Sequence, residues 1–133
     1  MSQIMRCFEF PKASVAARSY KCEVDGKSQT LTMQGGVYDW AKMTLVPAKA
    51  SLADANRQAI GRLTSDAGIA VMSSYSDGNT TAYVTDVAAA LRNAFGYPDA
   101  ICYWNESGWS SGKGGLHTRS LRERVIYTNL DAG

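Results

Sequence analysis

The chain has 133 residues, of which 45% are hydrophobic and 20% are charged, and this length and balance are typical of a single globular domain. Fourteen basic and twelve acidic side chains give a net charge of +2 without a run of lysine or arginine, which argues against nucleic acid as a partner. No apolar run approaches the roughly 20 residues of a membrane span, and the first residues lack the pattern of a signal peptide, so no membrane partner is expected.

Three widely separated cysteines, Cys7, Cys22 and Cys102, and one histidine, His117, limit the chemistry that the sequence can support. An odd number of cysteines without a Cys-x-x-Cys pair predicts neither a disulfide framework nor a metal site, and no cofactor is expected. Free cysteine is usually buried, so we expect all three to be small buried side chains. Nothing in the sequence brings His117 to a cysteine. The acidic residues, Asp66 among them, are scattered singly and form no catalytic pair.

The first third of the chain predicts a short helix followed by a β-hairpin. Apolar residues at positions 1, 4, 5 and 8 lie on one helical face, and Pro11 is expected to end that helix. Apolar residues then alternate over 19–24 and again at 31 and 33, on either side of Asp25-Gly26. This pattern predicts two antiparallel strands joined by a tight turn.

A compact aromatic segment, residues 37–43, follows the Gly35-Gly36 break after the hairpin. Its Asp39 lies between Tyr38 and Trp40, where a carboxylate is either a charge in a pocket or part of a turn. The turn is the more common role, so we expect a structural Asp39.

The clearest helical pattern begins near Ser51. Ser51-Leu-Ala-Asp54 fits a helix cap, and apolar residues spaced three and four apart over 52–67 predict a long helix. Gly68 stands where a helix commonly ends in a left-handed residue. Ile69-Ala-Val-Met72 is then expected to form a buried strand, which leads into a polar loop over 73–81.

A second amphipathic helix is predicted over 81–95, because its apolar residues share one face and Gly96 follows it. Residues 100–104 are short, apolar and β-prone, and residues 105–115 have the composition of a surface loop. A third helix is expected over 116–132, with apolar residues on two faces, Ile126 and Leu130 on the second. A strand is the alternative there, because Val125-Ile-Tyr-Thr128 is rich in β-branched residues. A partner for the second face of the helix would lie beyond Gly133, so we expect the isolated chain to expose apolar surface there and to aggregate.

Several of these segments, in this order, resemble the streptopain-like cysteine peptidases, which have a papain-like fold. Met1-Ser-Gln-Ile-Met-Arg with the later Phe10-Pro11 is similar to the end of that family's nucleophile helix. Tyr38-Asp39-Trp40 with Met43 resembles its Tyr-Asp-Trp box, and 66–97 resembles the stretch that follows. Leu130-Asp-Ala-Gly133 resembles the helix end that precedes the catalytic histidine segment. The resemblance covers nearly the whole chain.

The resemblance implies an α+β architecture: a partial papain-like cysteine peptidase fold with three to four helices, a β-hairpin and short strands. Residues 1–133 would be a single incomplete peptidase domain, the central fragment of a secreted cysteine endopeptidase. The nucleophilic cysteine would lie just over one helical turn upstream of Met1 and the catalytic histidine downstream of Gly133, so no catalytic residue is expected within the chain. A protein or peptide substrate is the implied partner, with a propeptide or an inhibitor as a further one.

The same resemblance places the loop after Ile69 to Val71 beside the substrate cleft. The candidate substrate-binding residues are Tyr75, Ser76, Thr80, Thr81 and Ala82. Capping of the following helix is an equally open role for Thr80 and Thr81. The alternative function is a non-catalytic module that keeps the peptidase scaffold and uses its aromatic residues to hold a peptide or a glycan.

Overall fold

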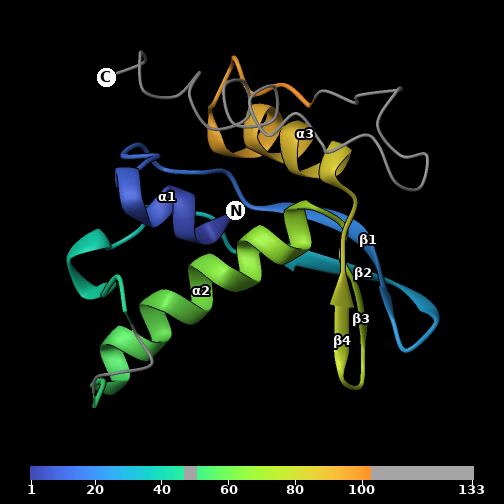
Figure 1. The fold of residues 1–133 in the computed structure, drawn as a ribbon, viewed down its shortest axis with the longest axis horizontal. Helices are drawn as coiled ribbons and strands as arrows, with labels where there is room; N and C mark the ends of the chain where they lie inside the picture. The colour runs from blue at the N-terminus through green and yellow to red at the C-terminus, as the bar shows by residue number, and fades with distance from the viewer. Residues whose placement is uncertain (47–50, 103–133) are drawn as a thin grey trace, which may run out of the picture.

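The computed structural model describes residues 1–46 and 51–102 of the chain. In chain order these residues form α1 (Ser2–Phe8), β1 (Arg18–Val24), β2 (Lys27–Met33), the 3₁₀ turn η1 (Trp40–Lys42), α2 (Asp54–Ala70), β3 (Ser74–Ser76), β4 (Asn79–Thr81) and α3 (Val84–Phe95). The predicted α+β class is confirmed, and the predicted hairpin is present as β1 and β2 (Figure 1).

The four strands form one sheet in the order β2-β1-β3-β4. β1 and β2 pair antiparallel over their full lengths around the Asp25-Gly26 turn. β3 joins the other side of β1 in parallel over two residue pairs, and the Asp25 N–H donates to the Tyr75 carbonyl at 2.8 Å just beyond them. β4 pairs antiparallel with β3, so the sheet consists of two hairpins that meet along β1 and β3.

The two faces of this sheet differ sharply in polarity, because paired residues on neighbouring strands point to the same side. Cys22 and Met33 lie on the face that packs against α2, and both are almost fully buried. The opposite, outer face carries side chains of serine, threonine, lysine and glutamate. Two hydrogen bonds cross strands on this face, between Ser19 and Thr32 at 2.8 Å and from Ser74 to Glu23 at 3.0 Å.

The start of α2 differs from the prediction. The helix begins at Asp54 with Ala53 as its N-cap, and no side chain caps it, so the predicted cap by Ser51 is wrong. Asp54 forms an exposed ion pair with Arg57 one turn further on instead. The carboxylate therefore lies in the first turn, where it complements the positive end of the helix dipole.

The end of α2 also differs, because Gly68 lies inside the helix and the predicted strand at Ile69 to Met72 is wrong. The helix continues to Ala70, and Met72, with φ 51°, turns the chain back toward the sheet. Leu63, Ala67 and Ala70 form one buried stripe on α2. Burial of this stripe extends the helix through the glycine, which costs only about 1 kcal/mol relative to alanine in a helix.

The predicted loop at 73–81 is replaced by the short β3–β4 hairpin, which turns at Asp77-Gly78 with Gly78 at φ 81°. The predicted helix after it is confirmed as α3, but it begins at Val84 and has Tyr83 as its N-cap. Thr80 and Thr81 therefore do not cap this helix. Gly96 ends α3 in the left-handed conformation, as predicted.

One core holds these elements together. The helix predicted near the N-terminus is confirmed as α1, which ends at a left-handed Glu9 shortly before Pro11. Behind it, the Tyr97 and Phe10 rings meet edge to face at 4.7 Å, and the Tyr97 hydroxyl donates to the Phe10 carbonyl at 2.9 Å. The core cluster also contains buried residues from all three helices and from β1 and β2, among them Met5, Cys22, Met33, Leu63, Leu91 and Phe95.

The structure tests only the first residues of the predicted C-terminal elements, because the described residues end at 102. Ala100 is fully buried, but residues 100–102 are not a strand, so the predicted strand over 100–104 is wrong in its described part. The predicted loop over 105–115 and the predicted helix over 116–132 lie outside the described residues, as do His117, Ile126 and Leu130. Within residues 1–46 and 51–102, no helix is long and apolar enough to cross a bilayer.

Gly35 offers a test of the packing at the end of β2. It has φ 63°, and a Cβ there would lie 2.8 Å from the Ala16 carbonyl carbon and 2.9 Å from the Ala17 nitrogen, both backbone atoms. We expect Gly35→Ala to lower the free energy of unfolding by more than about 2 kcal/mol, because left-handed strain and backbone overlap add together. The measurement is urea unfolding of the variant against the wild type.

Gly26→Ala is the matched control, because Gly26 also has positive φ (73°) but a Cβ there meets nothing within 4 Å. It should lose only about 1 kcal/mol from the left-handed conformation. Equal losses for the two variants would show that the close approach of residues 15–17 to Gly35 is unimportant.

Candidate functional site

A groove of about 520 Å³ runs along the outer face of the sheet, and we call it the outer groove. It is lined by Lys21, Cys22, Glu23, Ser28, Met72, Ser74, Thr81, Ala82 and Tyr83. Both hairpins and the segment that leads into α3 contribute to it. The lining combines one cation, one carboxylate and several hydroxyl groups with the ring of Tyr83, which is 78% exposed. Such a surface can hydrogen-bond an extended polar chain and stack against one flat group.

The structure brings two of the five predicted substrate-binding residues, Thr81 and Ala82, into this groove. Tyr75 and Thr80 pair across the hairpin, so their side chains share the opposite face, toward α2. Tyr75 is half-buried there, and a Cβ on Gly68 of α2 would lie 2.5 Å from its hydroxyl. Burial raises the pKa of Tyr75. Ser76 donates to the Asn79 carbonyl at 3.0 Å, which closes the hairpin, and it does not line the groove.

The three cysteines differ in burial. Cys22 is buried as predicted, with its Sγ 3.7 Å from the Ile69 carbonyl, and burial raises the pKa of its thiol. Cys102 is half-buried. The prediction is wrong for Cys7, which is exposed because the buried face of α1 contains Met5 and leaves position 7 on another side. Cys7 also lies in the last turn of α1, at the opposite end of the helix from its N-terminus.

The described part of the chain offers these cysteines no histidine as a general base. A thiolate needs a lowered pKa and a nearby base, and the residues at 1–46 and 51–102 include no histidine. The same ranges hold no group of three or more histidine, cysteine, aspartate or glutamate side chains that could bind a metal ion.

Asp66 is a buried charged residue that the sequence pattern did not reveal. It lies on the buried stripe of α2 and is only 1% exposed. Its Oδ1 accepts the Gln34 N–H at 2.7 Å, and its Oδ2 accepts the Gly35 N–H at 3.0 Å and the Tyr38 hydroxyl at 2.9 Å. The sequence held one sign of this burial, because Asp66 follows Leu63 by three residues and so falls on the apolar stripe of the helix.

Tyr38 and Arg62 complete this buried group. Burial and the hydrogen bond to Asp66 raise the pKa of Tyr38 far above its usual range. The guanidinium of Arg62, one turn before Asp66 on α2, lies 5.7 Å from the centre of the Tyr38 ring. Its Nε is buried and has no hydrogen-bond partner among the described residues. The positive charge of Arg62 acts against the rise in the pKa of Tyr38.

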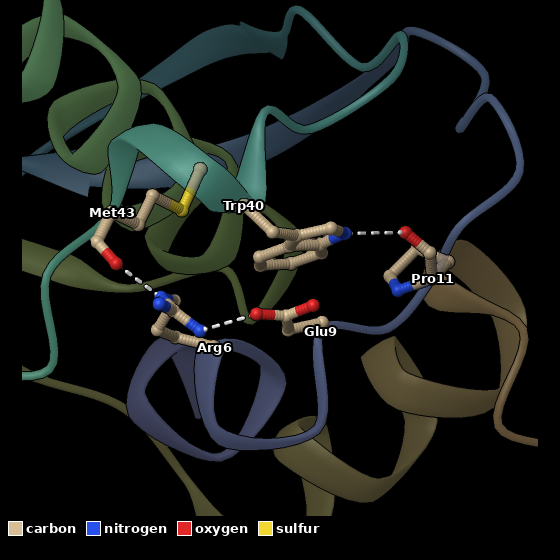
Figure 2. A network of polar contacts seen from close by, with 5 residues as sticks. All are labelled: Arg6, Glu9, Pro11, Trp40 and Met43. Carbon is tan, nitrogen blue, oxygen red and sulfur yellow. Dashed lines mark hydrogen bonds and ion pairs between the residues drawn. The ribbon is translucent and has the colours of Figure 1, made fainter.

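The segment from Gln34 to Met43, which we call the 34–43 strap, connects this group to α1. Figure 2 shows its far end, where Arg6 of α1 donates from Nε to the Met43 carbonyl and also pairs with Glu9 at 3.0 Å. The Trp40 Nε1–H donates to the Pro11 carbonyl at 3.2 Å, just after α1 (Figure 2). The strap therefore contacts α2 at its start and α1 at its end, where η1 also packs against α2 and the Lys42 carbonyl accepts from the Asn56 side chain at 2.8 Å.

Asp39 has the structural role that was predicted for it. It lies in the turn that begins η1, where its carbonyl accepts the Lys42 N–H at 3.1 Å. Its exposed carboxylate pairs with the Lys42 ammonium at 2.8 Å, and this hydrogen bond lowers the pKa of Asp39. Asp39 is therefore not a charge in a pocket.

A second hollow, of about 660 Å³, lies between the first turns of α1, the end of the strap and α2. No sequence pattern predicted it. Its lining is more apolar than that of the outer groove, with Arg6 as its only charged side chain, and comprises Met1, Ser2, Gln3, Arg6, Met43, Thr44, Leu45, Ile60, Leu63 and Thr64.

Comparisons with known proteins give one consistent result. The sequence profile described as the Peptidase C10 family matches residues 1–133. The fold is similar to that of the active wild-type interpain A cysteine protease of Prevotella intermedia, with a TM-score of 0.65 and 26% identity over 79% of this chain. It is also similar to a prointerpain A fragment from the same organism, with a TM-score of 0.64 and 26% identity over 75% of this chain.

The aligned part makes up 46% of the interpain A chain and 33% of the prointerpain A chain, so this chain spans less than half the length of either neighbour. No curated protein sequence matches the chain. The papain-like fold predicted from the sequence is confirmed by the two structural neighbours.

The contact between Gly68 and Tyr75 can be measured with a double-mutant cycle. Alone, Gly68→Ala should destabilise the chain or leave it unchanged, because the new Cβ meets the Tyr75 hydroxyl and offsets the helix propensity of alanine. In a Tyr75→Phe background the hydroxyl is absent, so Gly68→Ala should stabilise the chain by up to about 1 kcal/mol.

Gly61→Ala is the control within the same helix, because a Cβ at Gly61 meets nothing within 4 Å. Urea unfolding should show a gain of about 1 kcal/mol for it in both backgrounds. If Gly68→Ala behaves like Gly61→Ala without Tyr75→Phe, the Tyr75 ring does not pack against α2 in solution.

Proposed function

We propose a role in proteolysis for this chain, which belongs to the Peptidase C10 family. It would form the central part of a cysteine endopeptidase, one incomplete domain that supplies scaffold and a wall of the substrate cleft. The observation that carries this proposal is the match of the family profile to all residues from 1 to 133. The similarity of the fold to an active cysteine protease supports it, as does the share of that protein that the chain spans.

The chemistry of such an enzyme requires a thiolate that attacks a peptide carbonyl and a histidine that protonates the leaving amine. A nucleophile at the N-terminal end of a helix gains from the helix dipole, which lowers the pKa of its thiol. Cys7 and Cys22 lack these conditions, since one lies at the opposite helix end and the other is buried. From the resemblance to the peptidase family, we propose that both catalytic residues lie outside residues 1–133, with the cysteine just before α1.

The β3–β4 hairpin and the residues after it would form the cleft wall. Thr81 and Ala82 are the strongest candidates for substrate contact, because they line the outer groove. Tyr75, Ser76 and Thr80 would shape the hairpin that carries them. The substrate would be a protein or peptide. The parent enzyme would act outside the cell and be made with a propeptide, which the prointerpain A neighbour supports.

The first test is chemical and uses the 133 residues alone. We expect no peptide hydrolysis and no covalent labelling by an active-site epoxide inhibitor, because such inhibitors need an activated thiolate. Iodoacetamide, as a control, should alkylate the exposed Cys7 and show that the protein carries an accessible thiol. Stoichiometric epoxide labelling at Cys7, Cys22 or Cys102 would contradict the proposal.

The coding DNA on either side of the chain gives a second check. An in-frame Gly-Cys-x-Ala-Thr-Ala segment before Met1 and a Gly-Gly-His-Ala segment after Gly133 are expected. The resulting polypeptide should hydrolyse peptides and react with the epoxide at the upstream cysteine.

A substitution in the outer groove tests the cleft wall in that polypeptide. Ala82→Leu should narrow the groove and lower kcat/KM for peptide substrates by about tenfold or more, since added methylenes obstruct a fitted subsite. Ala13→Leu is the matched control, because Ala13 is exposed and does not line the outer groove, and it should leave kcat/KM unchanged. If both variants retain wild-type kcat/KM, the outer groove does not contact substrate.

A non-catalytic binding module remains the alternative, and Tyr83 is the observation that favours it. Its ring is 78% exposed beside a polar groove, an arrangement suited to stacking on a sugar or a peptide side chain. Stop codons on both flanks of the chain, together with loss of ligand binding in Tyr83→Ala, would favour the module over the peptidase.

A further inference from the structure

We propose that Asp66 is a positioning residue that fixes the orientation of α1 through the 34–43 strap. Asp66 touches neither the outer groove nor the hollow beside α1. It acts on the backbone that follows β2, and that backbone acts on α1. The final step, from α1 to a nucleophile that precedes it, rests on the proposed function.

The first step is the hold of Asp66 on the start of the strap. A buried carboxyl group requires hydrogen-bond partners, and Asp66 accepts from three donors, on Gln34, Gly35 and Tyr38. Two of the donors are consecutive backbone N–H groups just after β2 ends at Met33. Among the described residues these two N–H groups have no backbone partner, so the carboxyl group determines where the chain leaves the sheet.

The second step runs along the strap. Tyr38 is held at its hydroxyl by Asp66, and its ring lies 5.5 Å from the ring of Trp40. The Trp40 indole N–H donates to the Pro11 carbonyl, and the Met43 carbonyl accepts from Arg6. One bond starts from η1, at Trp40, and the other from Met43, the residue that ends this turn, as Figure 2 shows.

The third step concerns what these bonds add to packing. Met5 is fully buried, and α1 also contacts α2 directly. Apolar burial would therefore hold α1 against the core even without these hydrogen bonds. Apolar contacts are not directional, whereas a hydrogen bond weakens steeply as its angle departs from linear. The Arg6 and Trp40 bonds therefore set the rotation of a short, seven-residue helix that packing leaves free to shift.

In a peptidase whose nucleophile precedes α1, a small rotation of this helix would move the thiolate away from the scissile carbonyl. Misplacement of a reacting group reduces the rate of the chemical step more than it reduces substrate binding. Loss of the Asp66 hydrogen bonds is therefore expected to lower kcat by about tenfold or more and to change KM by less than about twofold.

The test uses Asp66→Asn, Tyr38→Phe and Trp40→Phe in the full polypeptide that contains this chain, followed by hydrogen exchange and mass spectrometry. Asp66→Asn keeps the volume of the side chain but leaves at least one of the three donors without an acceptor. Amide exchange should rise about tenfold or more in residues 34–38 and also in α1. It should stay unchanged in the β1–β2 hairpin and in α3.

The other two variants test separate hydrogen bonds between Asp66 and α1. Tyr38→Phe removes one of the three bonds and should give a smaller rise in the same two segments. Trp40→Phe keeps an aromatic ring but removes the bond to Pro11, so exchange should rise near the end of α1 and stay unchanged at residues 34 and 35. Asp54→Asn, at an exposed aspartate on the same helix as Asp66, is the control and should change exchange in neither segment.

Two outcomes would overturn the proposal. If Asp66→Asn raises exchange at residues 34–38 while α1 matches the control, the strap does not transmit its position to α1. If exchange rises equally in α1, α3 and the hairpin, Asp66 contributes only to global stability. Hydrogen exchange does not depend on catalysis, so a polypeptide without peptidase activity would refute the proposed function and leave this test intact.

Discussion

A buried carboxylate is the constraint on which the rest of this structure depends. Removing a polar group from water is unfavourable unless hydrogen-bond partners replace the solvent, and Asp66 obtains its donors from the chain that leaves β2 and from Tyr38. One side chain on α2 thereby satisfies two backbone groups at a strand end, where they would otherwise be unpaired. The helix and the sheet are joined by directional bonds as well as by apolar packing.

Elements with strong local signals could be predicted from the sequence. Asp25-Gly26 between alternating residues predicted the β1–β2 hairpin, and the apolar stripe with Gly96 predicted α3. Ile69 to Met72 was wrongly predicted to be a strand, because a short apolar run suits a buried strand and a buried helix end equally. The β3–β4 hairpin was missed because its strands have three residues each, too few to show alternation, and because β3 pairs with a strand about 50 residues earlier in the chain.

In the candidate site, too, local sequence signals could be interpreted, whereas contacts between residues far apart in the chain could not. The resemblance to a peptidase family indicated residues 75–82, but strand pairing decides which of these side chains share a face. Thr81 lies in the outer groove, whereas Tyr75 and Thr80 lie on the opposite side. Asp66 escaped notice for a related reason, since its partners are 28 to 32 residues away and no local pattern marks a carboxylate as buried.

The narrow join between the two hairpins has a consequence for the cooperativity of the sheet. β1 and β3 share two residue pairs, with one further bond from Asp25 to Tyr75, whereas β1 and β2 share seven pairs. The seam between the hairpins is thus the weakest line across the sheet, and sub-global opening is expected to begin there. Since the outer groove takes its lining from both sides of the seam, opening of the sheet at the seam would change the width of the groove.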